Sequence, residues 1–133
     1  MKSYTNLEQS QKLAEMLPTE SADMVLLHEE PYETSDSKFD GLHQALCVPF
    51  SKYNKSWRQK YRNISYFPCW SLAALLEIIR KPTALDLLID GRGYRCHCRD
   101  KQEGKFYGTD DYCDTPIDAC IEVILKLHEQ KLL

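Results

Sequence analysis

The stretch WSLAALLEIIR, residues 70–80, predicts the clearest helix in this chain. Its large apolar side chains recur at helical spacing and form one stripe, made by Leu72, Leu75, Leu76 and Ile79. Pro82 follows closely and is a typical stop signal. We therefore expect an amphipathic helix that packs its stripe against a sheet.

The residues after this helix predict an antiparallel meander. ALDLLID (84–90) alternates apolar and polar side chains, and Gly91 and Gly93 suit a tight turn. YRCHCRD (94–100) is then the return strand of a hairpin. KQEG (101–104) predicts a second turn, and KFYGTDDY (105–112) a third strand.

A second helix is predicted after the meander. Thr115 is a natural N-cap, Pro116 suits the first helical position, and Asp118 favours the positive end of the helix. The side chains expected on its buried face are Ile117, Cys120, Ile121, Ile124 and Leu125. This C-terminal helix should face the same sheet as residues 70–80.

The first half of the chain carries weaker signals. Asn6 and Gln9 resemble a capping box, so a helix should begin there and stop before Pro18. Residues 22–29 predict a buried strand, 43–50 a weaker strand, and 29–41 a loop. The expected fold class is α+β, an α-β-α sandwich with a small antiparallel sheet of about three to five strands.

Composition favours one globular domain spanning residues 1–133. The net charge of −3 argues against a general nucleic-acid coat. The N-terminus lacks the apolar core of a signal peptide, and no apolar run approaches the roughly 18 residues of a membrane span. A cytoplasmic protein without membrane contact is expected. The irregularly spaced cysteines should then be free thiols: Cys47, Cys69, Cys96, Cys98, Cys113 and Cys120.

Two stretches carry a resemblance, PCWSLAALLEII (68–79) and DTPIDACIEVILKLHEQKLL (114–133). They resemble uncharacterised proteins of phages and prophage-like elements of gut bacteria, and more distantly the phage ABA sandwich domain. The resemblance covers about residues 68–133 and implies an α-β-α sandwich and a mobile-element origin. It implies no catalytic residue, because its motifs are helix caps, alanine packing and an apolar stripe.

Cys96, His97 and Cys98 invite a metal-binding interpretation. In a strand, however, Tyr94, Cys96 and Cys98 share one face while His97 points to the other. A tetrahedral zinc site also needs a further ligand pair, for which Cys47 and Cys113 are the loose candidates. We therefore expect two thiols packed under a helix, with no metal and no cofactor.

Catalytic motifs are not evident. The sequence has neither a Gly-x-Ser-x-Gly elbow nor a glycine-rich phosphate loop. A Cys-His pair is formally possible, but a nucleophilic thiol needs an exposed, electropositive setting. Cys120 lies instead on an apolar helix face, so no catalytic residue is predicted.

Charge is unevenly distributed, and this is the strongest functional signal. From Gly41 to Leu76 there is no Asp or Glu. This span contains SKYNKSWRQKYRN (51–63), whose cations and rings alternate closely. The candidate binding residues are Lys52, Tyr53, Lys55, Trp57, Arg58, Tyr61 and Arg62. Such a segment suits an acidic protein partner or single-stranded nucleic acid, or else packs on the domain with its charges solvated.

These observations favour a non-enzymatic accessory or interaction domain of phage or mobile-element origin, with an acidic protein as its partner. The alternative is a small nucleic-acid-binding module that uses residues 51–63. A thiol- or zinc-dependent enzyme is the third hypothesis.

Overall fold

The structure, a computed structural model, describes residues 3–29, 43–52, 64–90 and 92–133. The chain divides into two compact units. One is the continuous stretch Asn6–Trp70, and the other joins the N-terminal residues up to Thr5 to Ser71–Leu133. The boundary falls close to residue 68, where the resemblance begins. The expectation of a single domain stays a prediction.

The unit Asn6–Trp70 begins with helix α1, Leu7–Ala14. Its capping box is confirmed: Gln9 N donates to Asn6 Oδ1 at 2.8 Å, and Asn6 N donates to Gln9 Oε1 at 3.0 Å. The helix ends at Ala14, earlier than Pro18 had suggested, and the chain continues as turns. The proline thus marks a position that the helix does not pass, but it does not determine which residue is the last helical one.

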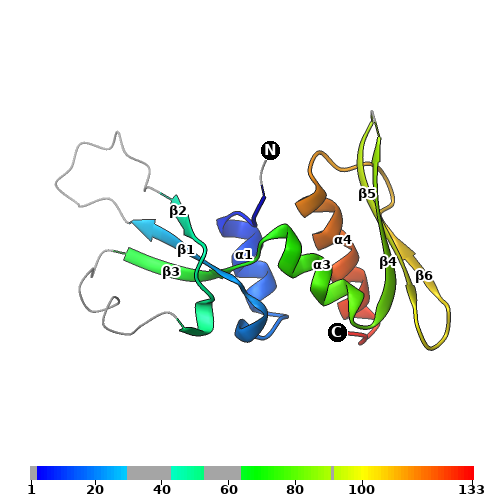
Figure 1. Cartoon of the computed structure of the whole chain (residues 1–133), viewed down its shortest axis with the longest axis horizontal. Coiled ribbons are helices and arrows are strands. Elements are labelled where there is room, and N and C mark those ends of the chain that lie inside the picture. Colours follow the sequence, from blue (N-terminus) through cyan, green and yellow to red (C-terminus); the bar gives the residue numbers. More distant parts are fainter. Residues whose placement is uncertain (1–2, 30–42, 53–63, 91) are drawn as a thin grey trace. The chain divides into compact units, whose positions relative to one another are not determined.

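The sheet of this unit has the antiparallel order β2-β1-β3 (Figure 1). Its strands are β1 (Met24–Glu29), β2 (His43–Leu46) and β3 (Ile64–Cys69), and its short 3-10 helices are η1 (Thr19–Ser21) and η2 (Phe50–Lys52). β1 and β2 confirm the expected strands, with β2 shorter than residues 43–50. β3 is a strand that the sequence analysis did not predict.

Helix α1 packs against β3, and the core of this unit forms between them and β1. Trp70 is fully buried and closes that core. Its indole Nε1 donates to Ser21 Oγ at 3.0 Å, and the Ser21 hydroxyl donates in turn to Pro18 O at 2.6 Å. The large ring is therefore accommodated with its one polar atom hydrogen-bonded.

The second unit contains a sheet of order β4-β5-β6, all antiparallel. Its strands are β4 (Thr83–Asp90), β5 (Gly93–Asp100) and β6 (Phe106–Gly108). The expected hairpin and meander are confirmed. Gly93 has φ of 129° and Gly104 has φ of 71°, so both turns use a backbone conformation that favours glycine.

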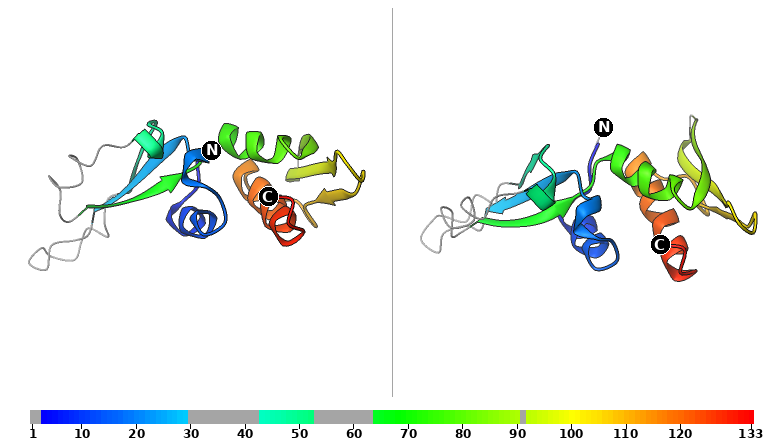
Figure 2. Two further views of the ribbon diagram at one scale, coloured as in Figure 1. Left: turned by 90° about the horizontal axis from the view of Figure 1, so that it is seen from below. Right: turned by 60° about the horizontal axis from the view of Figure 1, so that its bottom comes forward.

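Two helices complete this unit, α3 (Leu72–Arg80) and α4 (Pro116–Glu129). The predicted cap of α4 is confirmed, because Asp118 N donates to Thr115 Oγ1 at 3.1 Å. Ser71 caps α3 in the same way, accepting from Ala74 N at 3.2 Å. The helices pack against each other, α3 against β4, and α4 against β5 and β6 (Figures 1 and 2).

Most of the predicted core residues of this unit are buried. Leu75, Ile79, Ile117, Ile121 and Ile124 are at most 8% exposed, whereas Leu72 and Leu76 are only half-buried. The buried side of α4 is also wider than one stripe and includes Ala119, Val123 and Leu127. A helix that packs against both a sheet and another helix needs this broader apolar surface.

The expected α+β class, with small antiparallel sheets and a C-terminal helix, is confirmed. Among the described residues the strands form two three-stranded sheets rather than one. In the second unit α3 and α4 lie on the same face of the sheet, where the α-β-α expectation placed helix layers on both sides (Figure 2). Because α3 and α4 cover one face of this sheet, the opposite face is the candidate binding surface in the described part of this unit.

Candidate functional site

Strand β5 has two faces of different chemistry. Cys96 is fully buried and Cys98 is 2% exposed, on the side where α4 packs. Arg95, His97 and Arg99 occupy the alternating positions and belong to the other face. The predicted alternation within YRCHCRD is thus confirmed, and it leaves a row of cationic and imidazole side chains on the face away from α4.

Aromatic rings lie beside this row. The His97 and Phe106 rings meet edge to face, with centroids 5.1 Å apart. Arg99 lies over the Phe106 ring at 5.8 Å, and Arg95 lies over the Tyr112 ring at 5.3 Å. We call this surface the outer face; it comprises Arg92, Arg95, His97, Arg99, Phe106 and Tyr112.

Gly108 makes the contact between the two rings possible. It pairs with His97 across the β5–β6 ladder. A Cβ atom at Gly108 would lie 2.9 Å from His97 Cδ2 and 3.1 Å from Phe106 Cε1. Glycine therefore leaves the space in which the imidazole and the phenyl ring pack.

A hollow of about 220 Å³ opens on the outer face, lined by Ala84, His97, Cys98, Arg99 and Phe106. Phe106 is 53% exposed, although it is a large apolar side chain. Two buried nitrogens of this face, Arg95 Nε and His97 Nε2, have no hydrogen-bond partner within the described chain. Such groups cost about 1–3 kcal/mol each, and in native structures they call for an explanation.

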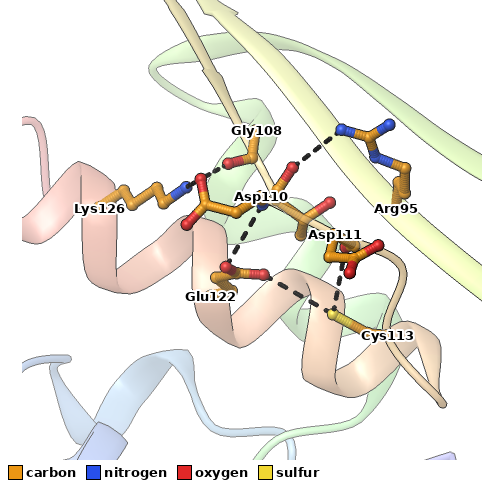
Figure 3. Close-up of polar contacts among 8 residues, drawn as sticks. Arg95, Gly108, Asp110, Asp111, Cys113, Glu122 and Lys126 are labelled. Carbon is orange, nitrogen blue, oxygen red and sulfur yellow. Dashed lines mark hydrogen bonds and ion pairs between the residues drawn. The ribbon is translucent and has the colours of Figure 1, made fainter.

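The connection from β6 to α4 holds one end of the outer face (Figure 3). Arg95 Nη2 donates to Thr109 O at 3.1 Å. On the helix side, Lys126 Nζ donates to Gly108 O at 2.6 Å and forms an ion pair with Asp110 at 2.8 Å. Helix α4 therefore holds residues 108–110 in place, and the Arg95 guanidinium hydrogen-bonds to the carbonyl of Thr109 in that segment.

Glu122 adds a second attachment for the same connection (Figure 3). Its carboxylate accepts from Asp110 N at 3.4 Å and from the Cys113 thiol at 3.7 Å. Burial, together with the neighbouring Glu122 carboxylate, raises the pKa of Cys113 to about 11. Cys113 is therefore a protonated hydrogen-bond donor at neutral pH rather than a reactive thiolate.

The thiols under α4 are also far from nucleophilic. The pKa of Cys96 is strongly raised by its hydrogen bond with Cys120 and by burial. Burial likewise raises the pKa of Cys98. No group of three or more His, Cys, Asp or Glu side chains suited to a metal occurs in the described parts of the chain.

The sheet as a whole carries only a small excess of basic residues. Residues 83–108 contain five basic and four acidic side chains, in a chain whose net charge is −3. Asp100 is 7% exposed and accepts from Gln102 N at 3.1 Å and Glu103 N at 3.3 Å, so its carboxylate is engaged in the turn. Asp86 of β4 lies opposite His97 in the β4–β5 ladder, so the row of Arg95, His97 and Arg99 has an acidic residue next to its centre.

No family model, curated protein or solved structure matches this chain. The resemblance of residues 68–133 to phage proteins therefore stays a prediction. Among the described residues, no helix combines the length and the apolar character that a membrane span requires.

The predicted binding segment 51–63 is described only at its start. Lys52 is exposed and ends the 3-10 helix η2. Tyr53, Lys55, Trp57, Arg58, Tyr61 and Arg62 lie outside the described residues, so that prediction stays as it was. The outer face was not predicted as a site, although the alternation of Arg95, His97 and Arg99 with two cysteines was its signal.

Proposed function

We propose that this chain is a non-enzymatic interaction domain of phage or mobile-element origin, acting in the cytoplasm, and that its outer face binds an anionic partner. The observation that carries the proposal is the row of Arg95, His97 and Arg99 beside an exposed phenyl ring. Negative charge on a partner would complement this surface and steer the partner toward it.

One feature supports binding over a merely solvated surface. The exposed Phe106 ring and the hollow beside it offer apolar area that a partner would remove from water.

An interaction role also agrees with the state of the thiols. A nucleophilic cysteine needs a lowered pKa, whereas Cys96, Cys98 and Cys113 have raised pKa values. The mobile-element origin rests on the resemblance of residues 68–133 alone.

The test uses two anionic probes, fluorescently labelled poly-glutamate and a labelled single-stranded oligothymidylate. We expect at least one of them to bind the whole protein at low salt, and Arg99→Gln to weaken that binding. Arg80→Gln is the matched control, because it removes the same charge from α3, where Arg80 pairs with Glu77 at 2.8 Å. Equal affinities for both variants and the unaltered protein, or no binding of either probe, would contradict the proposal.

A further inference from the structure

The spacing of the cations restricts the shape of the partner. Arg95 and Arg99 lie four residues apart on one strand, which separates their Cα atoms by about 13 Å. His97 lies between them on the same face. A ligand that reaches both guanidinium groups must therefore be extended and carry more than one negative charge.

The ring beside Arg99 restricts the chemistry of the partner. Phe106 is 53% exposed, and the hollow that it lines measures about 220 Å³. A cavity of about 150 Å³ in another protein holds a benzene molecule, so this hollow has room for a planar ring. Single-stranded nucleic acids carry planar rings between phosphates, and their bases stack on exposed aromatic side chains.

Other polyanions fit this surface less completely. A peptide made of acidic residues alone would neutralise the arginines but would leave the Phe106 ring and the hollow without a complementary group. A duplex keeps its bases stacked inside and offers no free ring to a flat aromatic surface. The outer face, with Arg99 beside Phe106 and Arg95 beside Tyr112, thus suits a chain that carries both phosphates and exposed bases.

We infer that the anionic partner is a single-stranded nucleic acid, with one base stacked on Phe106 in the hollow and neighbouring phosphates bound by Arg95 and Arg99. The inference rests on the proposed function and makes it specific. His97 also lines the hollow and packs edge to face on Phe106, so its imidazole borders the position of that base.

The decisive experiment distinguishes the contribution of the bases to the affinity from that of the phosphates. Fluorescence anisotropy compares a short oligothymidylate with an abasic strand of the same length, which keeps the phosphates and lacks the bases. We expect the intact strand to bind more tightly. Phe106→Ala should weaken its binding about 5- to 160-fold, the range measured for a lost base-stacking contact, and should leave the abasic strand unaffected.

Two further variants sharpen this comparison. Phe106→Tyr keeps the ring and should retain most of the affinity for oligothymidylate. Arg99→Gln should weaken both strands and reduce the slope of log affinity against log salt by about 0.7, the value for one phosphate contact on a single strand. Because Phe106 and Arg99 are exposed, these variants should fold normally, which circular dichroism checks.

Each contrary outcome has a distinct meaning. Equal affinity for the two strands, or no effect of Phe106→Ala, overturns base stacking while the anion-binding function stands. Binding of poly-glutamate alone does the same. Loss of oligothymidylate binding on Trp57→Ala, with Phe106→Ala unchanged, also overturns the inference and moves the interface to residues 51–63. No binding of any strand or of poly-glutamate overturns both proposals.

Discussion

The two faces of strand β5 differ in burial and in chemistry. On the inner face, the small thiols of Cys96 and Cys98 are buried under helix α4. On the outer face, Arg95, His97 and Arg99 lie beside exposed or half-exposed rings. Because successive side chains alternate, one short strand can serve packing and recognition separately, and substitutions on one face should leave the other unaffected.

The largest effect should come from the helix that covers the inner face. Ile124 is fully buried on α4, so Ile124→Ala should lower the free energy of unfolding by about 2–5 kcal/mol through lost apolar contact and a cavity. Denaturant unfolding measures this loss. The neighbouring Leu125→Ala, at a half-buried position, should cost less. A loss at Ile124 below about 0.5 kcal/mol would mean that the inner face does not carry the stability of this unit.

The turn that joins the hairpin should rank second. Gly93 has φ of 129°, and a Cβ atom there would lie 2.6 Å from the backbone oxygen of Cys113. Gly93→Ala should therefore destabilise the protein by about 1–3 kcal/mol, since both the backbone conformation and the contact disfavour alanine. Thermal melting provides the measurement. Gly104→Ala is the control, because its added Cβ meets no atom within 4 Å and only the positive φ of 71° opposes it.

The reactivity of the Cys113 thiol should show the next, smaller effect. Burial and the Glu122 carboxylate raise the pKa of Cys113 to about 11, so its alkylation by iodoacetamide should be slow at mildly alkaline pH. Glu122→Gln removes the nearby negative charge, lowers this pKa and should speed the reaction. Both proteins should carry Cys47→Ser, because Cys47 is an exposed thiol that would react first. Equal alkylation rates would show that Glu122 does not control Cys113.

The smallest effects on stability should occur on the outer face itself. Arg99 and Phe106 are exposed, so Arg99→Gln and Phe106→Ala should each change the free energy of unfolding by less than about 0.5 kcal/mol. Denaturant unfolding of these variants, compared with Ile124→Ala, measures how well the faces are separated. A loss of unfolding free energy above about 1 kcal/mol at either position would mean that Arg99 or Phe106 helps to stabilise the fold. The outer face would then not be a surface free for binding.

Local sequence signals predicted the second unit well. Thr115 with Pro116 starts α4, and Gly93 with its positive φ follows the hairpin turn, because caps and tight turns depend on residues within a few positions. β3 was missed for the opposite reason. It pairs with β1 across some 40 positions of sequence, as in Leu26 with Phe67, and Pro68 within it argued against a strand. An edge strand tolerates that proline, but its edge position is known only from the sheet.

The candidate site could be predicted only in part. Alternation placed Arg95, His97 and Arg99 on one face from the sequence alone. The rings that complete the outer face come from β6 and from Tyr112, and their positions depend on the register of Arg99 with Phe106 and on the attachment of residues 108–113 to α4. Which residues of two strands become neighbours cannot be predicted from the residue spacing within one of them.

The pairing of residues 3–5 with the start of α3 has a consequence for how the chain is assembled. Tyr4 forms an antiparallel bridge with Ser71, and Leu72 N donates to Ser3 O at 3.0 Å. The second unit is therefore discontinuous in sequence, and Asn6–Trp70 is an insertion whose two ends leave and re-enter it side by side. During synthesis the inserted unit is complete before the residues that pair with Ser3 and Tyr4 emerge. Because Tyr4 and Ser71 are paired, a short turn would be long enough to connect Thr5 to Ser71.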